Sequence, residues 1–316
     1  MRNYLARRLL QAIPVLLGIS LLLFLIMHAL PGGPMAMYLN NPNITPEQIA
    51  RMKHAYGLDR PLYVQYVSWL SDLVQGNLGK SFADGRPVLD RILERFLATL
   101  ELMGASYFVA MVLAIPLGVL ASLRQYSLAD ILTTVLAYLG ISMPTFWFGI
   151  VLIMVFSSWL HWFPSGGRIT QGGGGPLDVL NHLVLPTTVL ALYSVATWSR
   201  YVRSSMLEVL RSDYVRTARA KGLSERIVIY KHALRNALVP VVTVLALDAG
   251  YLFSGALITE TIFAWPGMGR LFWDSVLKRD YPLLMGILMI ASILVVALNL
   301  LADLIYVLLD PRIQYN

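Results

Sequence analysis

Six long apolar runs, almost free of charge, constrain this chain more than any other feature. A helix needs about 20 predominantly apolar residues to cross the hydrocarbon core of a bilayer. Only 14% of the residues are charged, against about 25% in an ordinary soluble domain. We therefore expect an all-α membrane protein with six transmembrane helices, at residues 9–30, 98–121, 131–160, 183–201, 238–258 and 283–309.

The first apolar run has two interpretations. Arg2, Arg7 and Arg8 precede it, as basic residues precede the apolar region of a secretory signal peptide. The run is longer than the usual apolar region of such a peptide, and no clear small-residue cleavage site follows it. We expect an uncleaved membrane span, with a signal peptide as the alternative.

Charge counts predict the orientation of the spans. If the N-terminus is cytoplasmic, the cytoplasmic segments, with Arg200, hold 14 Lys and Arg against 5 Asp and Glu. The outer segments then hold 11 against 10. Cytoplasmic loops of membrane proteins carry an excess of Lys and Arg. The counts therefore place both termini in the cytoplasm and the chain, as a multi-pass protein, in the cytoplasmic (inner) membrane.

A long outer segment is predicted to fold into helices of its own. Thr45 and Gln48 have the spacing of a capping box, with a proline at the first helical position, and Gly57 is placed to end that helix. A second apolar stripe follows and ends at Gly76. We divide the chain into a tail with span one (1–30), an extracytoplasmic helical subdomain (31–97) and a five-span core (98–316).

Several kinds of catalytic or ligand site are disfavoured. The chain has no cysteine, and its five histidines are scattered without ligand spacing. Lys80 and Ser81 resemble the end of a phosphate-binding loop, but position 74, where that motif needs glycine, is Val74. We expect no catalytic residues, no metal and no cofactor, and the chain should not bind ATP.

Acidic residues inside spans are costly and often functional. Glu101 and Asp303 lie near span ends, where water or an interfacial Arg would satisfy them. Asp248 lies near the middle of span five. A contact between helices explains it as well as a role in a transport path does. The candidate path residues are Asp248 with Tyr251 and Ser254, and Ser142 and Thr145 on either side of a Met-Pro pair. We expect ordinary packing of that proline in span three, with an interruption that lines a cavity as the alternative.

The cytoplasmic loop at 202–237 is basic, helical by propensity and broken at Gly222. It has too few apolar residues to bury a core alone. A loop of this kind would lie on anionic lipid or dock into another protein, where Ala218 and Gly222 would allow close approach.

This loop resembles the coupling loop of permeases from ATP-binding-cassette (ABC) importers, whose pattern is Glu-Ala-Ala, three residues, Gly, nine residues, Ile-x-Leu-Pro. Ala218, Gly222 and Leu234 match that pattern. Thr217 and Arg216 replace the first Ala and the Glu, and His232 and Arg235 replace the Ile and the Pro. Ala-Arg-Ala-Lys-Gly at 218–222 and His-Ala-Leu-Arg-Asn-Ala at 232–237 are similar to the variant of the dipeptide/oligopeptide/nickel import family.

Other stretches extend the resemblance over nearly the whole chain. They include His-Ala-Leu-Pro-Gly at 28–32, Tyr-Gly-Leu-Asp-Arg-Pro-Leu at 56–62, Glu-Thr-Ile-Phe-Ala-Trp-Pro-Gly-Met-Gly at 260–269 and Asp-Pro-Arg at 310–312. The long outer loop resembles that of the first of two permease subunits in this family. The implied fold is the MetI-like permease type.

The resemblance implies a non-catalytic subunit that moves dipeptides or oligopeptides. Its partners would be a second, homologous permease in a heterodimer, two cytoplasmic ATPase subunits, an extracytoplasmic substrate-binding protein and membrane lipid, with no nucleic acid. The residues implied in coupling to the ATPase lie in the cytoplasmic loop: Asp213, Arg216, Ala218, Lys221, Gly222, Leu223 and Leu234.

Other functions remain as alternatives. Relatives with the same machinery carry nickel complexes, glutathione or oligosaccharides. An ion-coupled carrier usually has more spans, often with inverted repeats, and no convincing repeat is found. An intramembrane enzyme would need a nucleophile and a base facing each other, and the sequence shows none.

Overall fold

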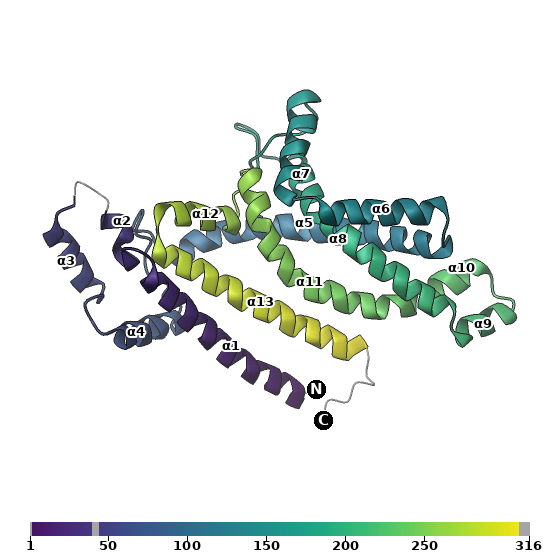
Figure 1. The fold of residues 1–316 in the computed structure, drawn as a ribbon, viewed down its shortest axis with the longest axis horizontal. Coiled ribbons are helices and arrows are strands. Elements are labelled where there is room, and N and C mark those ends of the chain that lie inside the picture. Colours follow the sequence, from purple (N-terminus) through teal and green to yellow (C-terminus); the bar gives the residue numbers. More distant parts are fainter. Residues whose placement is uncertain (1, 40–43, 310–316) are drawn as a thin grey trace. The chain divides into compact units, whose positions relative to one another are not determined.

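The computed structural model describes residues 2–39 and 44–309, and helices make up most of these ranges (Figure 1). Within them the only β-type pairing is an isolated bridge between Lys80 and Pro87. The all-α prediction is thus confirmed. The longer helices are α1 (Arg2–Ala29), α5 (Val88–Leu123), α6 (Leu128–Ser142), α8 (Pro176–Leu210), α11 (Arg235–Ile262) and α13 (Tyr281–Leu309).

Shorter helical pieces connect them. Before α5 come the 3-10 turn η1 (Gly33–Met35), α2 (Ala36–Leu39), α3 (Pro46–Ala55) and α4 (Leu62–Val74). After α6 come α7 (Thr145–Leu152) and the π-helix η2 (Ile153–Trp159). Between α8 and α11 lie α9 (Asp213–Ala220), α10 (Glu225–Ile227) and the π-helix η3 (Val228–Leu234). Between α11 and α13 lies α12 (Met268–Lys278), a helix that the sequence analysis did not predict.

Four helices are individually long and apolar enough to cross a membrane, namely α1, α5, α8 and α13. The pair α6 and α7–η2 would make a fifth crossing. The 28-residue α11 corresponds to predicted span five, and its length of about 42 Å exceeds the bilayer core. Six spans are consistent with this structure, and the exact number stays a prediction.

Predicted span three is not a straight helix. α6 and α7–η2 meet at an angle of 103°. Pro144 cannot donate to an α-helical ladder and restricts the residue before it to an extended backbone. Met143 accordingly has φ −79° and ψ 125°. A continuous helix over 131–160 is therefore wrong, and the alternative, an interruption at Met143 and Pro144, is found.

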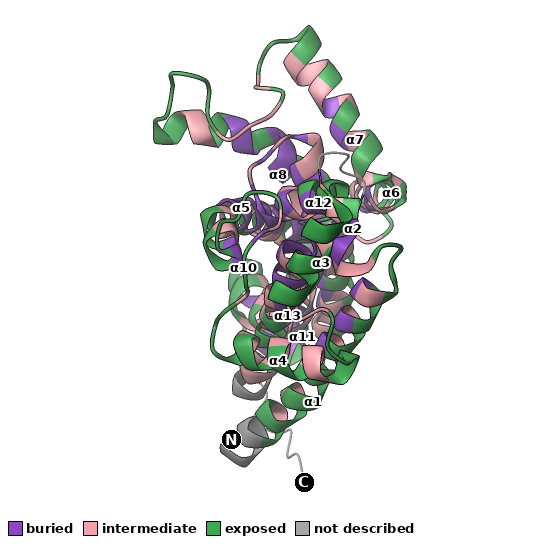
Figure 2. Ribbon diagram, turned by 90° about the vertical axis from the view of Figure 1, so that its left-hand side faces the viewer, coloured by how far each residue is buried: buried purple, intermediate pink, exposed green. Residues whose placement is uncertain are grey.

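The chain forms two compact units. Unit one comprises Met1–Ala98 and Gly267–Ala297, and unit two comprises Thr99–Pro266 and Leu298–Asn316. Burial in both follows the apolar faces of the helices (Figure 2). The exposed apolar side chains of α1 are those expected of a helix that faces lipid or another subunit, because only 11% of its most apolar stretch is buried.

Unit one contains the predicted outer helices. Thr45 and Gln48 form the predicted capping box at the start of α3. Gly57 and Gly76 have φ of +65° and +80° just after α3 and α4, as expected of glycines that end helices. The aromatic face of α4 packs on α1 and α13 in a buried cluster that includes Phe24, Met27, Tyr66, Trp69, Tyr281 and Met285.

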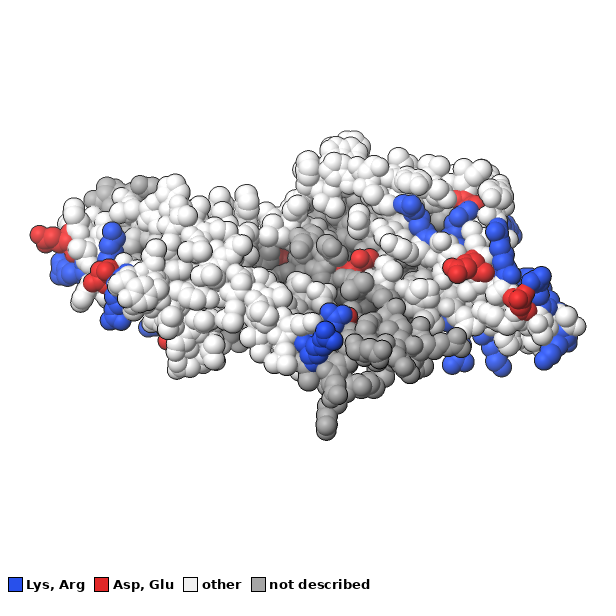
Figure 3. Space-filling view, turned by 60° about the horizontal axis from the view of Figure 1, so that its bottom comes forward, with Lys and Arg blue, Asp and Glu red and all other residues white. Residues whose placement is uncertain are grey.

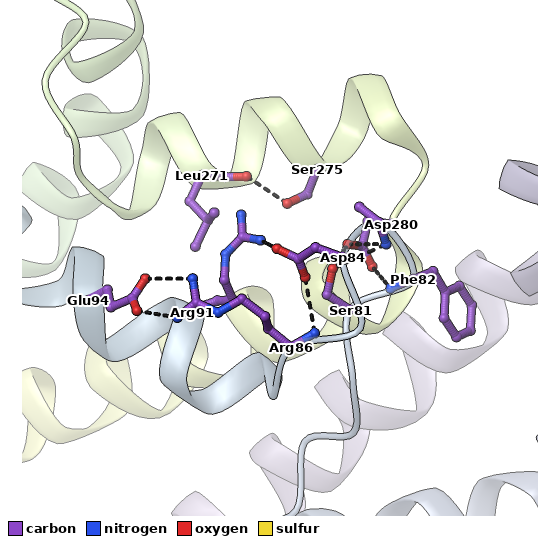
Figure 4. Close-up of polar contacts among 10 residues, drawn as sticks. Ser81, Phe82, Asp84, Arg86, Arg91, Glu94, Leu271, Ser275 and Asp280 are labelled. Atoms are coloured by element: carbon purple, nitrogen blue, oxygen red, sulfur yellow. Dashed lines mark hydrogen bonds and ion pairs between the residues drawn. The ribbon is translucent and has the colours of Figure 1, made fainter.

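A turn before α5 is held by charge (Figure 4). The carboxylate of Asp280 accepts bonds from the hydroxyl of Ser81 and the backbone N–H of Phe82. Arg91 pairs with Asp84, and Arg86 pairs with Glu94. Ser81 therefore has a structural partner, which explains it without a phosphate-binding role.

Unit two is built on close contact between α5 and α8. Small residues recur every fourth position on one face of α5, at Ser106, Ala110, Ala114 and Gly118. A Cβ atom on Gly118 would lie 2.6 Å from the backbone oxygen of Ser199 in α8. Small residues at this spacing let helix backbones approach in a membrane. The buried cluster continues through Trp198, Val202 and Met206 of α8 to Val241 and Leu245 of α11.

Candidate functional site

The cytoplasmic loop of the sequence analysis is shorter than predicted, because α8 extends to Leu210 and α11 begins at Arg235. The remainder, residues 213–234, is called here the α9–α10 segment. Gly222 separates its two helices at φ +75°. The N–H of Gly222 donates to the carbonyl of Arg219, and that of Leu223 donates to the carbonyl of Ala218. This paired arrangement is a Schellman cap, which requires a left-handed residue and favours glycine.

One face of the α9–α10 segment packs against its own chain. Val215 and Ala218 are buried in the cluster that contains Met206 of α8 and Val228 of η3. Ala218 is 7% exposed. Its small side chain therefore permits close packing within the subunit, whereas the sequence analysis assigned that closeness to a partner protein. Leu234 is half-buried against the same cluster.

The opposite face of the segment is exposed. Asp213, Arg216, Lys221, Gly222 and Leu223 all lie on it. Four large apolar or aromatic side chains are exposed among these charges, at positions that the sequence analysis mostly did not select: Tyr214, Leu223, Ile227 and Tyr230.

Ion pairs connect the segment internally. The guanidinium of Arg219 lies 2.8 Å from the carboxylate of Glu225, across the glycine turn. Arg216 pairs with Asp213 within α9. Both pairs are exposed, and exposed pairs contribute only about 0–1 kcal/mol. The turn is therefore held mainly by its backbone cap and its buried face.

Partly buried hydrogen bonds connect α8 to its neighbours. The indole N–H of Trp198 donates to Asp248 Oδ2 at 2.8 Å, and the ring of Tyr107 packs edge-on against Trp198. This is the helix-to-helix contact that the sequence analysis offered as the alternative explanation of Asp248. Ser205 also donates to the carbonyl of Ala237 at 2.7 Å, which fastens the end of α8 to the start of α11.

The predicted path residues fall in separate places. Ser142 is exposed at the bend between α6 and α7 and lines a shallow depression there, and Thr145 begins α7. Asp248 accepts its hydrogen bond from Trp198 of α8. Tyr251 and Ser254 belong to α11, but their side chains lie outside the described residues.

Two bidentate ion pairs in unit two join segments far apart in the chain. Arg203 of α8 contacts Asp130 of α6 through Nε at 2.6 Å and Nη2 at 2.8 Å. Arg168 contacts Glu101 through Nη2 at 2.7 Å and Nε at 2.8 Å. The expectation that an interfacial Arg satisfies Glu101 is confirmed. The Asp130 pair was missed, because nothing local in the sequence indicates a partner 73 residues away.

Lys and Arg side chains gather at one end of unit two, over α9, α10 and the adjoining ends of α6 and α8 (Figure 3). The segments predicted to be cytoplasmic, 122–130 and 202–237, meet at this end, as the contact between Asp130 and Arg203 requires. Among the described residues, no group of three or more His, Asp or Glu is placed to hold a metal ion.

Comparisons with known families and proteins agree over the whole chain. Residues 114–315 match the family described as binding-protein-dependent transport system inner membrane component, and residues 1–103 match the N-terminal family of the same transport systems. The chain is 46% identical to the oligopeptide transport system permease protein AppB of Bacillus subtilis. It is 41% identical to the di/tripeptide permease protein DppB of Pseudomonas aeruginosa and 40% identical to the dipeptide permease protein DppB of Escherichia coli. All of both chains is covered in each case.

Solved structures share the fold at lower identity. An inward-facing structure of the MetNI methionine ABC transporter superposes with a TM-score of 0.57 at 17% identity, covering 70% of this chain and 97% of that one. An amino acid ABC transporter crystallised with histidines gives 0.51 at 13% identity, covering 69% and 94%. These likenesses concern the fold alone, and they confirm the predicted MetI-like type.

Proposed function

The chain belongs to the family of binding-protein-dependent transport system inner membrane components, and from this premise we propose that it is a permease subunit of an ABC importer for peptides. The observation that carries the proposal is 46% identity over the full length of an oligopeptide permease. The other relatives are named for di/tripeptides and dipeptides. Nickel complexes, glutathione and oligosaccharides are the alternative cargoes.

The proposal gives this chain a transport role without catalysis. ATP would be hydrolysed by two cytoplasmic partner subunits, a second, homologous permease would complete the path, and an extracytoplasmic binding protein would deliver the peptide. The chain would be a multi-pass protein of the inner membrane with both termini in the cytoplasm. The basic end of unit two supports this orientation, because Lys and Arg favour the cytoplasmic side.

The α9–α10 segment is the proposed docking site for an ATPase subunit. Its exposed face combines apolar side chains such as Leu223 and Ile227 with cations such as Arg216 and Lys221. Apolar side chains left exposed among charges mark protein interaction surfaces. Ala218 and Leu234 would act from behind this face, by fixing the segment to α8 and α11.

Such fixing would transmit movement. α8 is one 35-residue helix that ends two residues before α9. A displacement of the α9–α10 segment would therefore reach the membrane through a rigid element rather than through a loose loop. The path residues that we propose, Ser142, Thr145, Asp248, Tyr251 and Ser254, would face a cavity shared with the second permease.

Uptake in cells lacking this chain tests the cargo. Restoring the full-length chain, with its partner genes intact, should restore uptake of a labelled tripeptide and leave uptake of a free amino acid unchanged. Uptake of nickel or glutathione in place of the tripeptide would contradict the peptide assignment.

Site-specific cross-linking tests the docking site, because the chain has no native cysteine. A cysteine at position 223, in Leu223→Cys, should cross-link to an ATPase subunit that carries a cysteine in its docking surface. Tyr126→Cys is the matched control, since Tyr126 is 81% exposed outside the α9–α10 segment. Equal cross-linking of both variants would refute the assignment.

A further inference from the structure

A cavity between α6 and α8 has a lining that no part of the proposed transport cycle uses. Its volume is about 480 Å³, and it is lined by two guanidinium groups and five hydroxyl groups. Arg200 and Arg203 supply the charges, and Thr134, Tyr138 and Thr197 supply three of the hydroxyls. No carboxylate lines the cavity. Every lining side chain can donate a hydrogen bond, which suits an anion with several oxygen atoms.

The two arginines are not equivalent. Arg203 is committed to Asp130 through two hydrogen bonds, so its charge is largely neutralised. Arg200 is exposed, and its guanidinium lies 4.7 Å from the ring centroid of Tyr138. A cation over an aromatic face keeps its N–H groups available at the ring's edges. Arg200 therefore supplies the net positive charge of the cavity.

The hydroxyl of Thr197 is a second, independent sign of a missing ligand. Its Oγ1 atom is buried and has no hydrogen-bond partner among the described residues. Threonines inside helices usually bond back to the carbonyl four residues earlier, as Thr133 and Thr188 do here. Thr187, the other buried hydroxyl without a partner, does not line this cavity. A ligand oxygen would satisfy this hydroxyl once the Thr197 side chain rotates it toward the cavity.

The surroundings indicate an amphipathic ligand. On α8, Tyr193 is 52% exposed, one turn of helix from Thr197 toward the middle of predicted span four, so apolar surface flanks the cavity on that side. Arg200 lies one residue before the predicted cytoplasmic end of span four at 201. Arg200 thus lies at the depth of lipid head groups, and Tyr193, about two turns earlier in α8, lies at the depth of the acyl chains.

We propose that this cavity binds the phosphate of an anionic phospholipid from the cytoplasmic leaflet, with Arg200 and Thr197 as its principal donors. Basic pockets between spans on the cytoplasmic side are suited to such head groups. A zwitterionic lipid or a transported peptide fits less well, because the lining offers no carboxylate to an ammonium group. The site is distinct from the α9–α10 segment and does not depend on the identity of the cargo.

Native mass spectrometry of the full-length chain, titrated with phosphatidylglycerol or phosphatidylcholine, tests the proposal. We expect retention of phosphatidylglycerol, and Arg200→Gln should weaken it about tenfold, which corresponds to one charge-assisted hydrogen bond. Thr197→Val should also weaken it while leaving thermal stability unchanged or higher, since the variant buries no unsatisfied hydroxyl. Arg124→Gln, which removes an exposed cation away from the cavity, should have no effect.

Three outcomes would overturn the proposal. The first is equal retention of the two lipids, or retention that neither cavity variant changes. The second is displacement of the lipid by inorganic phosphate at equal concentration, which would indicate a site for free anions. The third is an equal loss of peptide uptake in Arg200→Gln with and without phosphatidylglycerol in nanodiscs of the complete transporter, which would assign the cavity to the peptide.

Discussion

The contact between α5 and α8 predicts opposite effects for the same substitution at two glycines of one helix. In Gly118→Ala, the new Cβ would meet the Ser199 oxygen and the Val202 Cβ, both at 2.6 Å. The oxygen belongs to a helix backbone and cannot rotate away. The helices must separate by about 0.8 Å to restore an ordinary contact near 3.4 Å. In Gly104→Ala, the Cβ would meet nothing within 4 Å.

Two opposing energies decide whether each substitution stabilises or destabilises the chain. Overpacking costs about 1–3 kcal/mol, and replacing glycine by alanine within a helix gains about 0.5–1 kcal/mol. Gly118→Ala should therefore destabilise the chain by roughly 1–2 kcal/mol, while Gly104→Ala should stabilise it slightly.

Thermal unfolding in detergent, followed by circular dichroism, measures both effects. The midpoint should fall by about 1–3 °C for Gly118→Ala, since each kcal/mol corresponds to about 1.5 °C in a chain of this size. Gly104→Ala should unfold at or slightly above the temperature of the unmodified chain. If the midpoint were unchanged for Gly118→Ala and lowered for Gly104→Ala, the close approach of the α5 and α8 backbones at Gly118 would be refuted.

Three further predictions concern local contacts. Asp130→Asn should destabilise unit two by about 1–3 kcal/mol by removing a charge-assisted pair, and a double-mutant cycle with Arg203→Gln should show coupling; additive effects would contradict the pair. Gly222→Ala should reduce peptide uptake more than Gly222→Asn does, because asparagine tolerates the left-handed backbone better, and the reverse order would count against the cap. The hydrogen bond from His54 holds the pKa of Asp59 below its ordinary value. The stability that this hydrogen bond contributes is therefore present above about pH 4 and is lost as the pH falls through the lowered pKa. Amide exchange in α3 should report this loss, and Asp59→Asn should abolish the pH dependence.

Features that depend on residues close together in the sequence were predictable. The capping box at Thr45 and Gln48, the helix ends at Gly57 and Gly76, and the break at Pro144 each depend on a few neighbouring residues. They were found because the physical cause lies within one or two turns.

Features that depend on distant partners were not predictable. The burial of Ala218 requires α8 and η3 to converge on α9. The spacing of Val215 and Ala218 marks the apolar face of α9, but nothing within 213–222 indicates whether that face meets its own chain or a partner. The donor of Asp248 is Trp198, 50 residues earlier. The helix α12 begins at Met268, within the Trp-Pro-Gly-Met-Gly stretch at 265–269, and those residues contributed only to the resemblance.

The π-helix η3 has a consequence for how this chain tolerates a change in length. A π-helix bonds each residue to the fifth one along, so it holds more residues per turn than an α-helix. Removing Tyr230, which is 61% exposed, would let the backbone close into an ordinary α-helix without breaking the chain. Because one residue fewer would then fill the same turn, α9 and α10 would keep their orientation relative to α11. A one-residue deletion in η3 should therefore leave the same face of α9 and α10 exposed, whereas a deletion in the α-helical part of α11 would turn that face by about 100°.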